Sequence, residues 1–319
     1  MSTSFTTTAL VLGILNLSGI SEAQSFNWAN TKSVVSFGDS YSYILGTAGS
    51  PNPLHEGFLA QLHKLLHQIV LNGVIGTAEG GPNWLEFLTG CATSNGQYSP
   101  ANCPRKLWDF AFSGASVSEQ FLPRHLSVTI PLVNQTQQYL NYADAILTNT
   151  PVNLSRSSTL VAIWIGINDI FDSKTYKPSG RSDASFWGAE LDVVFNTCAK
   201  SLYARGFRNF LFMNLPPIDR TPANQRSSTP YPTKSQVNLW DSLLASKANT
   251  FQSANAGSKA MVYDANTFLN NVMSNPSAYG ITNTATYCSG WQQQDVLTNP
   301  GKYGCVPQSR YFWYNAAHL

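Results

Sequence analysis

The stretch Phe37-Gly38-Asp39-Ser40-Tyr41-Ser42 follows directly on an apolar run, residues 34–37, that has the composition of a buried strand. A glycine and small polar residues after a strand predict a tight turn, which would leave the Ser40 hydroxyl at the end of the strand. A Gly-Asp-Ser tripeptide alone is more often an ordinary turn or helix cap than a reactive site. The rest of the chain therefore decides what this serine means.

Four further β-rich apolar runs recur along the chain, each separated by a stretch long enough for a helix. The runs are residues 107–112, 160–165, 210–215 and 260–263, and the stretches with apolar residues at helical spacing are 57–70, 133–147, 184–204 and 235–251. This alternation predicts an α/β fold, a flavodoxin-like three-layer α/β/α sandwich around a central five-stranded parallel sheet. The polar segments 173–182 and 221–233 contain proline, and we expect loops there that form a lid or a binding rim.

Two more polar motifs follow predicted strands. Gly114 lies in Phe112-Ser113-Gly114-Ala115-Ser116, and Asn168 lies in Gly166-Ile167-Asn168-Asp169. In open parallel sheets, ligands bind at the carboxyl ends of the strands. We therefore expect Ser40, Gly114 and Asn168 to meet at one edge of the sheet.

These residue types, with His318 near the end of the sequence, can carry out acyl transfer. The reaction needs a hydroxyl, a base and hydrogen-bond donors for the oxyanion. Ser40 offers the hydroxyl and its own backbone N–H, Gly114 a second N–H and Asn168 a side-chain amide. His318 is the candidate base, and Asn315 stands three residues before it, where a carboxylate would hold the imidazole. The set predicts a serine esterase.

The four motifs, in this order and over nearly the whole chain, resemble those of the GDSL or SGNH hydrolase family. The resemblance implies that Ser40 is the nucleophile, that Gly114 and Asn168 complete the oxyanion hole, and that His318 is the base. The first motif, together with residues 81–84 (Gly-Pro-Asn-Trp), is most similar to the secreted fungal branch that includes the carbohydrate esterase family 16 acetyl esterases.

Asn315 departs from the family, which has Asp at this position. An amide oxygen can accept a hydrogen bond from the imidazole, but it brings no charge, and an amide turned the other way would favour the wrong tautomer. In a serine protease the equivalent change costs roughly 10⁴-fold in turnover. Some family members are thought to use a Ser–His dyad, which leaves a milder loss open. The family usually continues past a proline after this histidine, whereas this chain ends at Leu319, so whether its C-terminus is complete also stays open.

Several features indicate an exported chain. An apolar run at residues 9–17 and the small-residue pattern ending at Ala23 predict a signal peptide over 1–23, followed by one domain over 24–319. We expect two local disulfides, Cys91 with Cys103 and Cys288 with Cys305, and a buried free thiol at Cys198. If the chain is secreted, Asn134 and Asn153 are glycosylation sites, and both should be exposed.

Composition excludes several other classes of function. The 19 basic and 17 acidic residues nearly balance, so we expect neither a nucleic-acid partner nor stable membrane association. His63 and His67 have metal-ligand spacing without a third ligand, and we interpret them, like His55 and His125, as parts of partly exposed helix faces. Asp39 and Asp169 are expected to hold loops rather than to act as acids, and no metal or other cofactor is expected.

The leading hypothesis is a secreted, monomeric serine esterase that removes short acyl groups, acetyl in particular, from carbohydrate or another small ester through an acyl-enzyme on Ser40. One alternative is a GDSL lipase or phospholipase that acts on longer acyl chains. Another is a weakened or non-catalytic carbohydrate-binding protein, because Asn315 replaces the family Asp.

Overall fold

A five-stranded sheet forms the centre of the computed structural model, which describes residues 26–44, 77–78, 82–93, 96–97, 103–149, 152–293 and 295–319. The strand order is β4-β1-β5-β6-β7, and every neighbouring pair is parallel. The strands are β1 (Ser33–Gly38), β4 (Lys106–Asp109), β5 (Thr159–Trp164), β6 (Asn209–Met213) and β7 (Lys259–Tyr263). The predicted parallel sheet is confirmed, although the run 107–112 is a strand only as far as Asp109.

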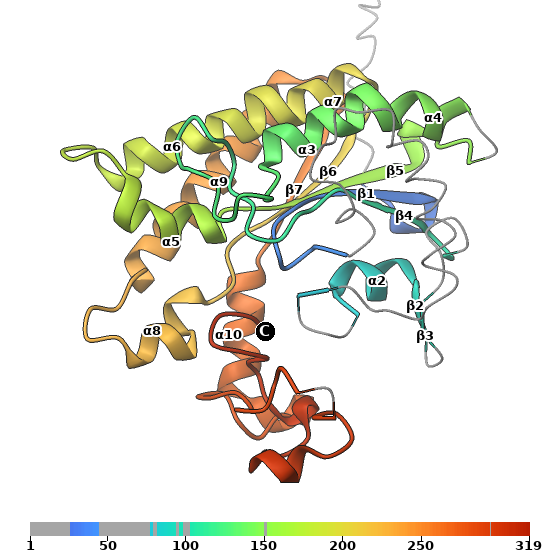
Figure 1. Cartoon of the computed structure of the whole chain (residues 1–319). Helices are drawn as coiled ribbons and strands as arrows, with labels where there is room; N and C mark the ends of the chain where they lie inside the picture. The colour runs from blue at the N-terminus through green and yellow to red at the C-terminus, as the bar shows by residue number, and fades with distance from the viewer. Residues whose placement is uncertain are drawn as a thin grey trace, which may run out of the picture.

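Successive residues of the central strands face opposite sides of the sheet, and each side has its own apolar core. Val35 and Phe37 lie in the larger core, which includes side chains of the helices α6 (Asp183–Val193) and α9 (Lys234–Ala254). Val34 belongs to a smaller core with Leu85 of α2 (Trp84–Thr89) and the cysteines 91 and 103. Figure 1 shows α3, α6, α7 and α9 over one face of the sheet and α2 over the other, which confirms the predicted three layers.

The predicted helices are present where the structure describes them, with internal irregularities. Each of the stretches 133–147 and 184–204 contains two α-helices joined by a π-helical turn, at Tyr139–Ala143 and Val194–Ala199. The remaining helices are α3 (Leu132–Gln138), α4 (Asp144–Asn149), α5 (Ile167–Tyr176), α7 (Lys200–Ala204), α8 (Pro222–Arg226) and α10 (Ala265–Ser274), with a small hairpin of β2 (Ala92–Thr93) and β3 (Gly96–Gln97). The 3-10 turns are Trp28–Asn30, Arg156–Ser158, Ile218–Arg220, Pro276–Tyr279, Pro300–Tyr303 and Gln308–Arg310.

Some predictions fall elsewhere. The signal peptide over 1–23, the helix over 57–70 and the histidines 55, 63 and 67 lie outside the described residues. The expected loop 173–182 is wrong in its first half, because α5 continues to Tyr176 and Ser173 is one of its buried residues. The segment 221–233 likewise contains the short helix α8, which the Thr221 side chain caps.

The cysteines follow the prediction, and one glycosylation site does not. Disulfides join Cys91 to Cys103 and Cys288 to Cys305. Cys198 is a buried free thiol. Burial raises its pKa to about 12, so it is poorly reactive.

The two glycosylation sequons differ in exposure. Asn153 is exposed, but Asn134 is half-buried in α3 and the threonine of its sequon, residue 136, is buried against the core. The prediction that both asparagines are exposed is therefore wrong for Asn134. Among the described helices, none combines the length and hydrophobicity needed to cross a bilayer.

Candidate active site

The turn that carries Ser40 is shaped by contacts to the neighbouring strand. Gly38, the last residue of β1, has φ of +154°, and a Cβ atom there would lie 2.2 Å from the carbonyl oxygen of Trp164 in β5. The buried side chain of Gln135 also holds Gly38, since it accepts from the Gly38 N–H at 3.0 Å and donates to the Gly38 carbonyl at 2.8 Å. The position of Ser40 is thus fixed by the backbone of the sheet.

His318 reaches Ser40 across 278 positions of sequence. Its Nε2 lies 2.9 Å from Ser40 Oγ, and its Nδ1 lies 3.1 Å from the side-chain oxygen of Asn315. The structure therefore brings together the serine, the histidine and the asparagine that sequence reasoning singled out.

The orientation of the Asn315 amide determines the tautomer of His318. The side-chain oxygen of Asn315 accepts two backbone N–H groups, from Ala317 and from His318, each at 2.9 Å. Because both donors need an acceptor, the amide oxygen rather than the amide nitrogen faces this turn and the imidazole. Nδ1 must then carry the proton, which leaves the lone pair of Nε2 directed at Ser40. Asn315 supplies no charge, however, and burial lowers the pKa of His318 to about 4.

Tyr41 holds residues 314–318, the histidine segment, and the sequence analysis did not identify it as part of the site. Its hydroxyl donates to the carbonyl of Ala317 at 2.8 Å, and its ring centre lies 5.4 Å from that of His318. On the other side, the N–H of Ala223 in α8 donates to the carbonyl of Ala316 at 3.1 Å. The only sequence signal for Tyr41 is its place directly after Ser40.

The predicted oxyanion donors lie at neighbouring strand ends. The N–H of Phe112 donates to the Gly38 carbonyl at 3.0 Å, which ties the segment before Gly114 to the end of β1. Gly114 adopts φ of +76°, a conformation that favours glycine. Asn168, the second residue of α5, donates one amide proton to the carbonyl of Ala115 at 2.8 Å. An amide nitrogen has two protons, so the second remains for a bound oxyanion.

Two buried carboxyl groups support this arrangement. Asp39 accepts from the N–H of Tyr41 at 3.0 Å, and Asp169 accepts from the N–H of Val117 at 2.8 Å. These contacts agree with the expectation that both residues hold loops. Burial raises the pKa of Asp39 to about 8 and that of Asp169 to about 7.

The N-terminus of α2 braces the other flank of the serine turn. Asn83 donates to the Ser42 carbonyl at 2.8 Å, and the Trp84 indole donates to Ser42 Oγ at 3.1 Å. Sequence reasoning noted these residues only as a family feature.

We expected His125 to lie on a partly exposed helix face, and this prediction is wrong. It belongs to the loop before α3, where its Nδ1 is 3.1 Å from a carboxylate oxygen of Asp172. Within the described residues, no group of His, Cys, Asp or Glu side chains is placed to hold a metal ion.

Comparisons with known proteins cover most of the chain. A family model described as GDSL-like Lipase/Acylhydrolase matches residues 34–313. An acetylesterase of Thermothelomyces thermophilus is 27% identical over 305 residues, which are 89% of this chain and 87% of that protein. A GDSL esterase/lipase of Arabidopsis thaliana is 26% identical over 222 residues, which are 66% and 59% of the two chains. A crystal structure from the lipolytic G-D-S-L family of Veillonella parvula covers 76% of this chain and 82% of its own, with 13% identity and a TM-score of 0.34.

Proposed function

Since the chain belongs to the GDSL-like lipase/acylhydrolase family, we propose that it is a secreted serine esterase that removes short acyl groups, above all acetyl, from carbohydrates through an acyl-enzyme on Ser40. One observation carries the proposal: Ser40 Oγ lies 2.9 Å from an imidazole nitrogen whose lone pair is free to accept its proton. The name of the acetylesterase relative supports the short acyl group.

The reaction would run in two steps. His318 Nε2 takes the Ser40 proton as Oγ attacks the ester carbonyl. The oxyanion that forms accepts hydrogen bonds from the backbone N–H groups of Ser40 and Gly114 and from the side-chain amide of Asn168. When the tetrahedral intermediate collapses, the imidazolium gives its proton to the departing alcohol and an acyl-serine remains. A water molecule then transfers a proton to Nε2 and attacks the acyl carbon, and the carboxylic acid leaves as Ser40 regains its proton.

Asn315 weakens this mechanism without abolishing it. Its oxygen fixes the productive tautomer of His318. The fall in turnover described for the serine protease, where the amide favours the wrong tautomer, is therefore not expected here. What is absent is a negative charge to stabilise the imidazolium. This geometry favours a weakened enzyme over a non-catalytic binding protein.

Action on longer acyl chains is the second candidate function. Leu126 and Val128 are 53% and 51% exposed in the loop that carries His125, and aliphatic side chains of this kind suit an acyl chain.

Substrate range and serine labelling test the proposal together. We expect faster hydrolysis of p-nitrophenyl acetate than of p-nitrophenyl palmitate, a loss of at least about 10³-fold in kcat for Ser40→Ala, and labelling of the Ser40 peptide by a fluorophosphonate. Ser246→Ala, at an exposed serine of α9, is the matched control. A preference for palmitate would refute the short-chain assignment, and full activity of Ser40→Ala would refute the nucleophile.

A further inference from the structure

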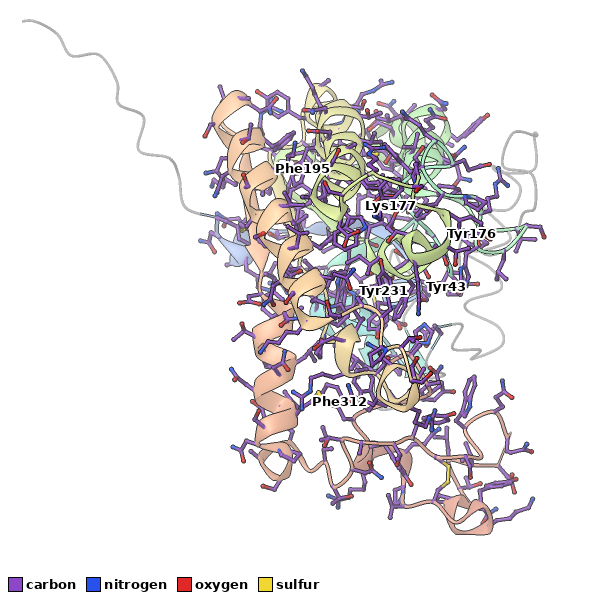
Figure 2. The ribbon with its side chains drawn as sticks, turned by 90° about the vertical axis from the view of Figure 1, so that its left-hand side faces the viewer. Tyr43, Tyr176, Lys177, Phe195, Tyr231 and Phe312 are labelled. Atoms are coloured by element: carbon purple, nitrogen blue, oxygen red, sulfur yellow. A yellow bond between two sulfur atoms is a disulfide. The ribbon has the colours of Figure 1, made fainter. Side chains whose placement is uncertain are left out.

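One face of α5 carries three chemically different side chains at successive turns. Asn168, Asp172 and Tyr176 are four residues apart and therefore share a face, with a rise of about 6 Å between neighbours. Asn168 and Asp172 are both half-buried, with 17% of the Asp172 side chain exposed, whereas Tyr176 is 52% exposed. Figure 2 labels Tyr176 on the ribbon of α5. The row leads from the oxyanion donor to solvent.

His125 joins this row from the facing loop. Its Nδ1 lies 3.1 Å from Asp172, and a Cβ atom on Gly114 would lie 3.3 Å from its ring. The histidine thus adjoins one proposed oxyanion donor, and its carboxylate partner is one helical turn from the other. Thr129 holds this loop, because its hydroxyl donates to the Ser113 carbonyl at 3.2 Å and accepts from the N–H of Leu126 at 3.3 Å.

The exposed atoms of the pair can bind a hydroxyl group. With Nδ1 directed at the carboxylate, Nε2 of His125 is the outer nitrogen, and the side chain is 46% exposed. In the part of the chain that the structure describes, Nε2 of His125 and the second carboxylate oxygen of Asp172 accept no hydrogen bond. Because the Nδ1 proton is used on the carboxylate, Nε2 and the second carboxylate oxygen are both acceptors, and a neighbouring O–H group can donate to either.

Tyr176 adds an exposed aromatic surface one turn further out. A sugar ring presents hydroxyl groups at its edge and C–H groups on its face, and it needs polar partners for the first and an aromatic ring for the second. The row provides both at a spacing of about 6 Å.

We propose that His125, Asp172 and Tyr176 form the rim that binds the alcohol part of the ester, and that this alcohol is a hydroxylated ring of the sugar class. The inference rests on the proposed function, because it takes Ser40 as the residue that attacks the ester. His125 and Asp172 hydrogen-bond to ring hydroxyls, and Tyr176 packs on the ring face.

Two acetyl esters of similar size test the rim: a monoacetylated methyl glucoside and cyclohexyl acetate, which has a six-membered ring without hydroxyls. We expect the ratio of their kcat/KM values to fall about tenfold in His125→Ala and in Tyr176→Ala, through KM. His125→Gln, which keeps a hydrogen-bond acceptor, and Tyr176→Phe, which keeps the ring, should restore part of the ratio. Arg124→Ala is the matched control, since Arg124 lies on the same loop in an exposed ion pair with Glu119.

Other outcomes overturn the inference. Equal losses for both esters, accompanied by a lower melting temperature, would mean that the pair only ties the loop to α5. A selective loss with p-nitrophenyl palmitate would mean that the rim binds an acyl chain. Calorimetric binding of the acetylated glucoside to Ser40→Ala, with and without His125→Ala, tests the rim independently of turnover. Unchanged binding refutes the rim, whereas weaker binding supports it even if the proposed chemistry fails.

Discussion

The two halves of the candidate site are held by different kinds of structure. Ser40, Gly114 and Asn168 follow three adjacent strands, and the Gly38 peptide is packed directly against the Trp164 carbonyl. His318, in contrast, sits outside the sheet, in a segment that hydrogen bonds from Tyr41 and Ala223 and the packing of its neighbours Trp313 and Leu319 hold in place. We infer from this difference that the position of Ser40, the proposed nucleophile, depends on the stability of the sheet, and we expect that His318, the proposed base, can be changed without unfolding the protein.

The largest effect should come from the rigid half, in Gly38→Ala. The new Cβ atom would meet a backbone oxygen at 2.2 Å, and the sheet leaves neither atom free to move. We expect a loss of more than about 4 kcal/mol in the free energy of unfolding, measured by urea denaturation. Gly188→Ala in α6 is the matched control, because no atom lies within 4 Å of its Cβ position and alanine favours a helix. Equal stability of the two variants would contradict the comparison.

The second largest effect should come from removing a disulfide, either the one beneath the sheet or the one that precedes the histidine segment. Replacing Cys288 and Cys305 by serine opens a loop of 17 residues between α10 and the histidine segment. We expect a loss of about 3 kcal/mol in stability and a large loss of esterase activity. The same double change at Cys91 and Cys103, 12 residues apart beneath the sheet, should cost similar stability but less activity at temperatures where both variants are folded. Equal activity losses would show that the histidine segment does not depend on its own disulfide.

The pH profile should reveal the missing charge at Asn315. His318 must be neutral to accept the Ser40 proton, and burial lowers its pKa to about 4. The activity seen at neutral pH should therefore be retained as the pH is lowered, until the pH approaches the pKa of His318. In Asn315→Asp the carboxylate favours the imidazolium, so the acid limb of kcat/KM should move to higher pH and kcat at neutral pH should rise about tenfold. Asn315→Ala, which removes the acceptor, should lower kcat. An acid limb unmoved by the Asp variant would mean that His318 is not the base.

The smallest effect should be that of Tyr41→Phe. The variant keeps the ring beside His318 and loses one hydrogen bond to the Ala317 carbonyl. A bond of about 1 kcal/mol corresponds to a five- to tenfold fall in kcat/KM if it acts only by placing the imidazole. Tyr203→Phe is the matched control, because its hydroxyl makes the same kind of bond, to Ala256 at 2.9 Å, far from the site in sequence. Equal effects of the two variants would remove Tyr41 from the site.

The sequence predicts the sheet well because each strand is a short apolar run, and a parallel sheet brings the residues after those runs to one edge. It does not predict that residues 173–176 are helical, because Ser173 is polar and a polar residue beside a proline-containing segment indicates a loop. In the structure the Ser173 hydroxyl is buried and hydrogen-bonded to the side chains of Tyr231 and Trp187. Gln135 and Tyr41 are missed for another reason. Each bonds to backbone 97 or 276 positions away, and no local pattern encodes such a contact.

The long separation between Ser40 and His318 has a consequence for heating. The histidine segment lies outside the sheet in a region without regular strands, whereas every residue of β1 and β5 is buried and paired within the sheet. Segments of this kind open locally at a fraction of the global unfolding free energy. The amides of residues 314–318 should therefore exchange with deuterium long before those of β1 and β5, and heat should inactivate the protein reversibly before it melts.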